Sequence, residues 1–151
     1  MSQETIINNL QILVTAVSQQ AFNHKIQSKV FASQTFTKLA DKYAAHYEEE
    51  MGFVDQFIDR LLDLGADVKN EDKKAMAVIS DPVAYIKADL EDSIQGLPVL
   101  HQMVQAAKDD ITTYDMLKDY YKDEEEDLYW SENELDLIEK IGVQNWLTKQ
   151  L

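Results

Sequence analysis

The sequence predicts an all-α protein: a four-helix bundle with one long crossover and a short fifth helix at its C-terminal end. The 151 residues include only 4 Gly and 2 Pro, so few turns are available and long helices are expected. Apolar residues recur at spacings of three and four over four long segments, which is the helical period. This length is typical of one domain, and we predict a single domain over residues 1–151.

The two N-terminal helices are predicted from their apolar periods and from the break between them. A helix over about 5–31 has apolar residues at the helical period from Ile6 to Val17. A second helix covers about 37–64 and ends at Gly65, the residue type preferred just beyond a helix C-terminus. Because the link between them is short, these two helices are expected to pack antiparallel.

The C-terminal half contains the crossover, two more long helices and the short fifth helix. In order, these are a crossover over 66–81, a helix over about 82–108, a helix from about 112 or 113 to 140, and an amphipathic segment over 143–151. Asp81-Pro82 marks the start of the third helix, with Asp as the cap and Pro at the first position. Gly142 separates the fourth helix from the fifth. The long crossover allows the second and third helices to run parallel.

The formal net charge of −14 narrows the classes of partner. Nucleic-acid binding needs clustered Lys and Arg, so no nucleic-acid partner is expected. No segment approaches the roughly 18 apolar residues of a membrane span, and the N-terminus lacks a signal-peptide pattern. We therefore expect a cytoplasmic protein with no membrane partner. The chain has no Cys, which excludes disulfides and thiolate metal sites. Metal cations are natural partners for so acidic a protein.

Two glutamates are the only acids in register with the predicted core stripes. The stripes read Tyr43, Tyr47, Glu50, Val54, Phe57 and Leu61 on the second helix, Ile86, Leu90, Ser93, Leu97, Leu100 and Val104 on the third, and Tyr114, Leu117, Tyr121, Glu124, Leu128, Ser131, Leu135 and Ile138 on the fourth. A buried carboxylate costs several kcal/mol unless it is protonated, hydrogen-bonded or metal-bound. Glu50 and Glu124 therefore indicate either a functional site or two carboxyl groups satisfied by neighbouring tyrosines. The candidate tyrosines are Tyr43, Tyr47, Tyr120 and Tyr121.

Three segments of the chain resemble bacterioferritin. DEEEDLYWSENELDLIEKIGVQNWLTKQL (123–151) is similar to the last helices of that family, in order, spacing and terminal helix. KLADKYAAHYEEEMGFVDQFIDRLLDLG (38–65) resembles its second helix, and SDPVAYIKADLE (80–91) matches its crossover in kind. The resemblance implies a ferritin-like four-helix bundle that binds iron or another divalent cation and self-associates into a hollow 24-mer shell.

The resemblance also implies where a di-iron centre would lie. Such a centre takes one Glu from each of two helices and a Glu-x-x-His motif from each of the other two. Glu50 and Glu124 match the Glu positions of the two motifs, but Phe53 and Asp127 stand at their His positions. Ser93 stands at the Glu position of the third helix, so much of the ligand set is replaced.

The first helix offers no replacement, because residues 5–40 contain no Asp or Glu. Two Glu and one Asp are too few to offset two divalent ions. We therefore expect standard ferroxidase activity to be slow or absent, with the centre largely lost. One hard divalent ion held by Glu50, Glu124 and Asp127, and completed by water, is predicted in its place.

Two further residues near Glu50 are candidate ligands. His46 precedes Glu50 by four residues and Glu49 by three, so both pairs lie on one helix face and Glu49 joins the candidate metal ligands. Met51 matches, by resemblance, the methionine that ligates haem b between two bacterioferritin subunits. The alternative for Met51 is simple packing at a subunit interface.

Three other functions remain open at the level of sequence. One is a mini-ferritin of the Dps type, with an iron site between subunits built from His24, Asp55 and Asp59. The second is an active enzyme with an unorthodox centre, which could also lie between subunits. The third is a structural subunit of a mixed shell, in which an active paralogous ferritin subunit supplies the oxidation.

Overall fold

The computed structural model describes residues 3–151 and is helical, with no strand among those residues. The helices are α1 (Gln3–Ser33), α2 (Thr37–Asp63), α3 (Pro82–Ala106), α4 (Ile111–Ile141) and α5 (Val143–Thr148). The all-α class is confirmed, and each predicted long helix begins and ends within about two residues of the observed one. Within residues 3–151, no helix has both the length and the apolar character needed to cross a membrane.

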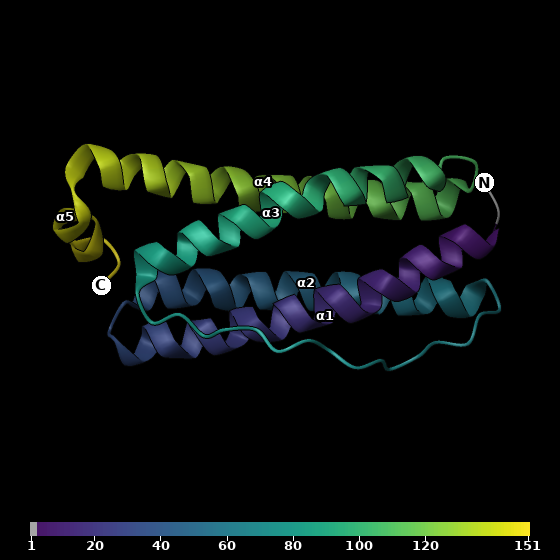
Figure 1. Cartoon of the computed structure of the whole chain (residues 1–151), viewed down its shortest axis with the longest axis horizontal. Coiled ribbons are helices and arrows are strands. Elements are labelled where there is room, and N and C mark those ends of the chain that lie inside the picture. Colours follow the sequence, from purple (N-terminus) through teal and green to yellow (C-terminus); the bar gives the residue numbers. More distant parts are fainter. Residues whose placement is uncertain (1–2) are drawn as a thin grey trace.

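The four long helices form two hairpins that pack side by side. Helices α1 and α2 form one pair and α3 and α4 the other, while α5 folds across one end of the bundle (Figure 1). The crossover between α2 and α3 runs the length of the bundle beside α1 (Figure 1). This connection brings α3 back parallel to α2, which is the predicted topology.

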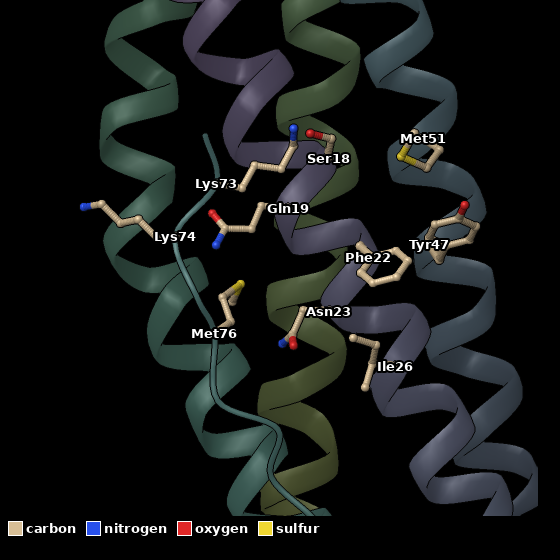
Figure 2. Close-up of a pocket in the computed structure, with 10 residues that line it drawn as sticks. All are labelled: Ser18, Gln19, Phe22, Asn23, Ile26, Tyr47, Met51, Lys73, Lys74 and Met76. Atoms are coloured by element: carbon tan, nitrogen blue, oxygen red, sulfur yellow. The ribbon is translucent and has the colours of Figure 1, made fainter. Parts of the chain in front are cut away.

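Glutamine side chains of α1 hold the crossover against the bundle. The amide of Gln27 donates to the carbonyl oxygen of Ile79 at 2.8 Å and accepts from the Ile79 backbone N–H at 2.9 Å. Gln11 makes the same pair of bonds with Lys69, both at 2.9 Å. A carboxamide can donate and accept at once, so it pairs with extended backbone as a strand would. The close-up in Figure 2 shows the crossover running alongside α1.

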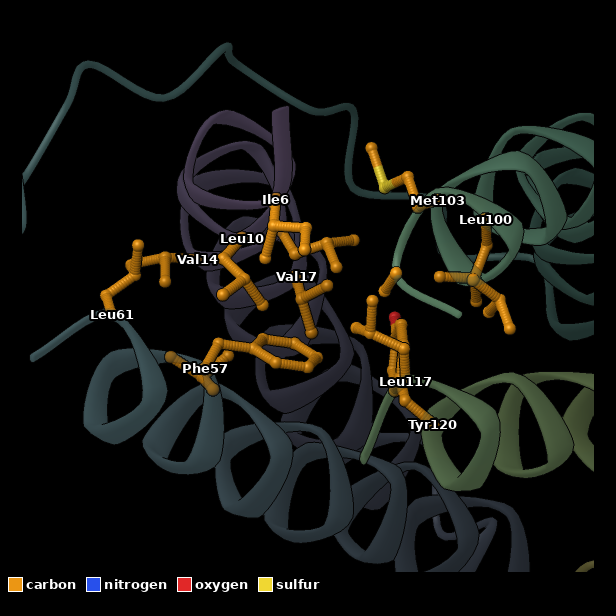
Figure 3. Packing of buried hydrophobic residues seen from close by; sticks show 14 residues of the cluster. Ile6, Leu10, Val14, Val17, Phe57, Leu61, Leu100, Met103, Leu117 and Tyr120 are labelled. Carbon is orange, nitrogen blue, oxygen red and sulfur yellow. The ribbon is translucent and has the colours of Figure 1, made fainter. Parts of the chain in front are cut away.

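The interior consists of two apolar clusters. The first joins the N-terminal half of α1 to α2, α3 and α4 (Figure 3), and its buried members are Ile6, Leu10, Leu13, Val14, Val17, Val54, Phe57, Leu61, Leu100, Met103, Val104, Ala107, Leu117 and Tyr120. The second lies at the α5 end, and its buried members are Phe31, Leu39, Ala40, Tyr43, Tyr85, Ile86, Ile138 and Trp146.

Between these two apolar clusters, the four long helices bury polar side chains. We call the following residues the polar layer: His24, His46, Glu50, Asp89, Ser93 and Glu124. Each of the four long helices contributes at least one of them. Glu50 and Glu124 are 0% and 9% exposed, so the prediction that these acids face the core is confirmed.

Two predicted core positions are wrong by one residue. On α3 the buried residue is Asp89, at 7% exposure, whereas Leu90 is only half-buried. On α4 it is Tyr120, at 4% exposure, rather than Tyr121. In both cases the buried side chain carries a polar group and belongs to the residue just before the predicted one.

The fifth helix packs onto its own bundle. Trp146 is fully buried in the second apolar cluster, and the backbone N–H of Lys38 donates to the carbonyl oxygen of Gln150 at 2.9 Å. Val143 and Leu151, at 44% and 60% exposure, are exposed apolar side chains of this C-terminal segment.

Candidate metal centre

His24 lies at the middle of the polar layer and joins three helices. From α1, its Nδ1 lies 2.6 Å from Oε1 of Glu50 on α2, and its Nε2 lies 2.8 Å from Oδ1 of Asp89 on α3. His24, Glu50 and Asp89 are 2%, 0% and 7% exposed. The partner of Glu50 is therefore an imidazole, and not the tyrosine that a purely structural interpretation requires.

Two carboxyl groups hold the His24 ring as an imidazolium when no metal is bound. Burial alone would lower the pKa of His24, but attraction to Glu50 and Asp89 outweighs it and raises the pKa well above the usual 6.5. Burial raises the pKa of Glu50, and contact with His24 opposes part of that rise. The positively charged ring of His24 thus contacts two carboxyl groups. The second oxygen of Glu50, Oε2, has no hydrogen-bond partner in residues 3–151.

His46 is buried beside this group with its nitrogens free. The residue is 1% exposed, and neither Nδ1 nor Nε2 has a hydrogen-bond partner within the described part of the chain. Oδ1 of Asp127 lies 3.4 Å from Nε2. Burial, followed by repulsion from His24, lowers the pKa of His46 to about 3. The ring is therefore neutral at physiological pH, and one nitrogen offers a lone pair.

Helix α4 adds further acids. Burial, followed by repulsion from Glu50, raises the pKa of Glu124 to about 8. Burial, followed by repulsion from Asp123, raises the pKa of Asp127 to about 9. Oxygens of Glu49, Asp123 and Asp127 all lie within 4.8 Å of one another between α2 and α4. So many close carboxyl groups favour either protons or a bound cation.

Aromatic rings close the side of the polar layer that faces α5. The His24 ring centroid lies 5.5 Å from that of Tyr43, and the His46 centroid lies 5.9 Å from that of Trp130. Tyr43 also packs edge-on against Tyr85, with centroids 5.1 Å apart. These rings exclude water, which strengthens every electrostatic interaction inside.

A model of the ferritin-like domain matches residues 7–141 of the chain. The chain belongs to the ferritin-like family. A bacterial ferritin of Neisseria meningitidis serogroup B is 28% identical over 98% of this chain and 97% of its own length. A bacterioferritin of Streptomyces coelicolor is 27% identical over 96% of this chain and 86% of its own. A bacterial ferritin of Synechocystis is 26% identical over 83% of each.

The standard di-iron ligand positions of a ferritin-like protein do not fit two metal ions here. Phe53, at a His position, packs against Tyr120 with ring centroids 5.1 Å apart. Ser93, at the Glu position of α3, lines a cavity of about 240 Å³ together with Tyr120. Val17 also lines it, as does Leu13, and by resemblance one of these two stands at the Glu position of α1. An aromatic pair, an apolar side chain and a hydroxyl thus stand at positions where a di-iron centre has carboxylate and imidazole ligands.

The structure brings only part of the predicted site together. Asp127 lies 3.4 Å from His46 and joins Glu49 in the outer carboxyl cluster. Glu50 and Glu124 are buried in the polar layer, but among the described residues neither belongs to a group of three close metal-binding donors. The Dps-type alternative assigned His24 to an iron site between subunits, together with Asp55 and Asp59. That assignment is wrong, because His24 is buried in the core and both aspartates are exposed on α2.

Asp89 and the role of His24 were missed by sequence reasoning. A signal existed for each of them. Asp89 precedes Ser93 by four residues, and His24 follows Val17 by seven, so both residues continue the helical period of the buried positions.

Met51 lies outside the polar layer, in a pocket of about 390 Å³ on the outer face of α1 and α2 (Figure 2). Phe22 lies beside Tyr47 and Met51 there, and Met76 of the crossover approaches from the opposite side. Lys73 and Lys74 also line this pocket. Met51 and Glu50 therefore point to different sites although they are adjacent in sequence.

Proposed function

We propose that this chain is a bacterioferritin-like subunit that binds and stores iron, or another divalent cation, inside a self-assembled shell in the cytoplasm. The observation that carries the proposal is the polar layer: ionisable side chains from all four helices of a ferritin-like bundle are buried together. A purely structural core would place apolar side chains there, since each buried ionisable group costs stability. The net charge of −14 adds a surface that attracts cations.

We further propose that the standard two-iron oxidation of this family is lost. Phe53, Val17 and Ser93 support this, because none of them can offset the charge of a second divalent ion. The metal ligands proposed from sequence are Glu50, Glu124, Asp127, His46 and Glu49. Of these, Glu49 and Asp127 lie nearest the surface and suit the approach of an incoming cation between α2 and α4.

Assembly and partners belong to the same proposal. A 24-mer shell and contact with an active paralogous subunit follow from the resemblance to bacterioferritin. The exposed apolar residues Phe22, Ile12 and Ile94, each at least 46% exposed, supply surface that a neighbouring subunit would cover. The smaller shell of the Dps type is the alternative, and the particle mass separates the two.

Haem b is a second candidate ligand, and the Met51 pocket favours it. Phe22, Ile26 and Tyr47 give this pocket an apolar lining that suits the faces of a porphyrin, and Lys73 and Lys74 suit its carboxylates. The thioether of Met51 is the group that would hold the iron. Haem added to the purified protein should give a methionine-ligated absorption spectrum that Met51→Leu abolishes. A wild-type protein that takes up no haem would leave Met51 as interface packing.

The proposed storage function is tested by adding ferrous iron to the purified shell, first without oxygen and then in air. We expect iron to elute with the protein, while its oxidation shows no fast phase beyond that of the buffer. A rapid phase of two ferrous ions per subunit would contradict the loss of the di-iron reaction. A shell that retains no iron would instead favour the structural subunit of a mixed shell.

A further inference from the structure

We propose that the polar layer holds one first-row divalent ion, ferrous iron foremost, bound by His24, His46 and Asp89. This site lies about one helical turn on α2 and α3, and about two turns on α1, from the positions where the family pattern puts its metal ligands. The inference deepens the proposed storage function and rests on it. It shares only His46 with the sequence-based ligand set and adds His24 and Asp89 in place of the glutamates and Asp127.

The three donors already lie close enough to share an ion. One nitrogen of His24, one nitrogen of His46 and one oxygen of Asp89 all lie within 4.8 Å of one another. The donors come from α1, α2 and α3, and each is at most 7% exposed. Bonds of about 2.1 Å to a central ion would need only small side-chain rotations.

His46 is the observation that separates this site from a cluster of ordinary ion pairs. Nearly every buried polar atom in a protein has a partner. Both ring nitrogens of His46 lack one among residues 3–151, although Asp127 and His24 are its neighbours. A buried imidazole whose two nitrogens have no hydrogen-bond partner is poised to bind a metal ion, and an ion would satisfy it.

Glu50 acts as a positioning residue for His24. Metal-binding histidines usually donate their second ring N–H to a carboxylate, which fixes the tautomer and the ring orientation. The contact of 2.6 Å from Nδ1 of His24 to Glu50 supplies that arrangement, and it leaves Nε2 facing Asp89. Nε2 of His24 and the carboxylate of Asp89 would hold the ion, and the proton that they share in the metal-free protein would be released to solvent.

The displacement runs in one direction along the bundle. Asp89 precedes Ser93 by four residues and His46 precedes Glu50 by four, which is about 6 Å on each helix. His24 follows the Val17 position on α1, which runs antiparallel to α2. All three donors therefore lie nearer the α5 end of the bundle than the family's ligand positions do, beside the aromatic rings of Tyr43 and Trp130.

The buried donors match a standard di-iron centre in number and type, but they lie at different positions on the helices. A standard di-iron centre uses four carboxylates and two imidazoles, with one ligand from each of two helices and two from each of the others. Here α1 and α3 contribute one donor each, α2 contributes two, and α4 contributes two. They are His24, Asp89, His46, Glu50, Glu124 and Asp127.

The ligand types decide which ions the site prefers. Two imidazoles with one carboxylate suit ferrous iron, Zn²⁺ and Co²⁺, whereas Mg²⁺ and Ca²⁺ prefer oxygen ligands alone. Three protein ligands leave coordination positions open, as in catalytic rather than structural metal sites. The neighbouring carboxyl groups of Glu124 and Asp127 offer negative charge to the same ion.

The test is a titration of the assembled shell with Co²⁺, whose visible absorption reports nitrogen ligation. We expect one Co²⁺ per subunit in the wild type. His46→Gln and Asp89→Asn should weaken binding by at least about 10-fold, and so should Glu50→Gln through the orientation of His24. His101→Gln is the matched control, because His101 is an exposed histidine of α3. It should leave the titration unchanged.

Two results would overturn the proposal. One is a Co²⁺ spectrum that His46→Gln and Asp89→Asn leave intact. The other is a loss of binding in His101→Gln equal to that in His46→Gln. Circular dichroism and gel filtration confirm that each variant still folds and assembles, and the isosteric Asp89→Asn keeps the test open if His46→Gln does not fold. Iron retention by the same shells, measured separately, distinguishes failure of this site from failure of the storage function.

Discussion

Glu124→Gln should make the metal-free protein more stable at alkaline pH. Glu124 is 9% exposed, and burial with repulsion from Glu50 raises its pKa from 4.5 to about 8. A raised pKa in the folded state means that stability is fully present below pH 4.5 and is lost as the pH rises through 8. The difference between 4.5 and about 8 corresponds to about 5 kcal/mol, at about 1.4 kcal/mol per pKa unit.

That figure is an upper limit for the variant, because Glu50 and Asp127 share the same repulsion. We expect Glu124→Gln to recover roughly half of it, or 2–3 kcal/mol, near pH 8.5 in the presence of a chelator. The raised pKa of His24 gives a loss of stability in the same direction, so the variant should flatten the pH profile without abolishing its slope.

The assay is urea unfolding of the wild type and the variant at several pH values from about 5 to 9. Glu126→Gln is the control, because Glu126 is an exposed acid on the same helix. Its profile should follow that of the wild type. Parallel profiles for the wild type and Glu124→Gln would refute the claim that burial of this carboxyl group costs stability.

Three further predictions concern the fold around the site. Gln27→Ala should lower the free energy of unfolding by about 2 kcal/mol in urea denaturation, because it removes two hydrogen bonds to the crossover at a fully buried position. Gln11→Ala should lower it by less, because the hydrogen bonds of Gln11 to the crossover are exposed. Arg60→Ala should cost about 1 kcal/mol in the same assay, since Arg60 joins α2 to Asp110 at the start of α4 at 2.9 Å but is partly exposed. Trp146→Ala should cost about 3–5 kcal/mol and lower the thermal midpoint, whereas Leu151→Ser should alter only the particle size measured by light scattering. Equal effects of the two glutamine variants, an unchanged Arg60 variant, or a thermal midpoint that Trp146→Ala leaves unchanged would contradict the corresponding interpretation.

Helix boundaries and the topology could be predicted because their signals are local. Gly65, Asp81-Pro82 and Gly142 mark ends and starts by backbone preference, and they hold whatever the helices pack against. The side chains that pin the crossover could not be predicted in the same way. Gln27 reads as an ordinary polar residue until its partner at Ile79, 52 residues away, is known.

The core stripe was ambiguous wherever seven residues separated two certain positions. Between Ile86 and Ser93, both 89 and 90 satisfy the helical period, and apolar preference selected Leu90 over Asp89. In a polar part of the core the preference is the opposite, because a buried acid is stabilised there by a buried hydrogen-bond partner. The identity of the partner, His24, depends on how α1 and α3 are placed in space, which no local pattern contains.

The position of a bound metal ion tests the displaced site most directly. Crystals of the shell soaked with ferrous iron or Co²⁺ would locate the ion by anomalous scattering at its absorption edge. The displaced site predicts one strong peak within bonding distance of His24, His46 and Asp89. A peak between Glu50 and Glu124 beside Ser93, with His24 still paired to Asp89, would contradict it.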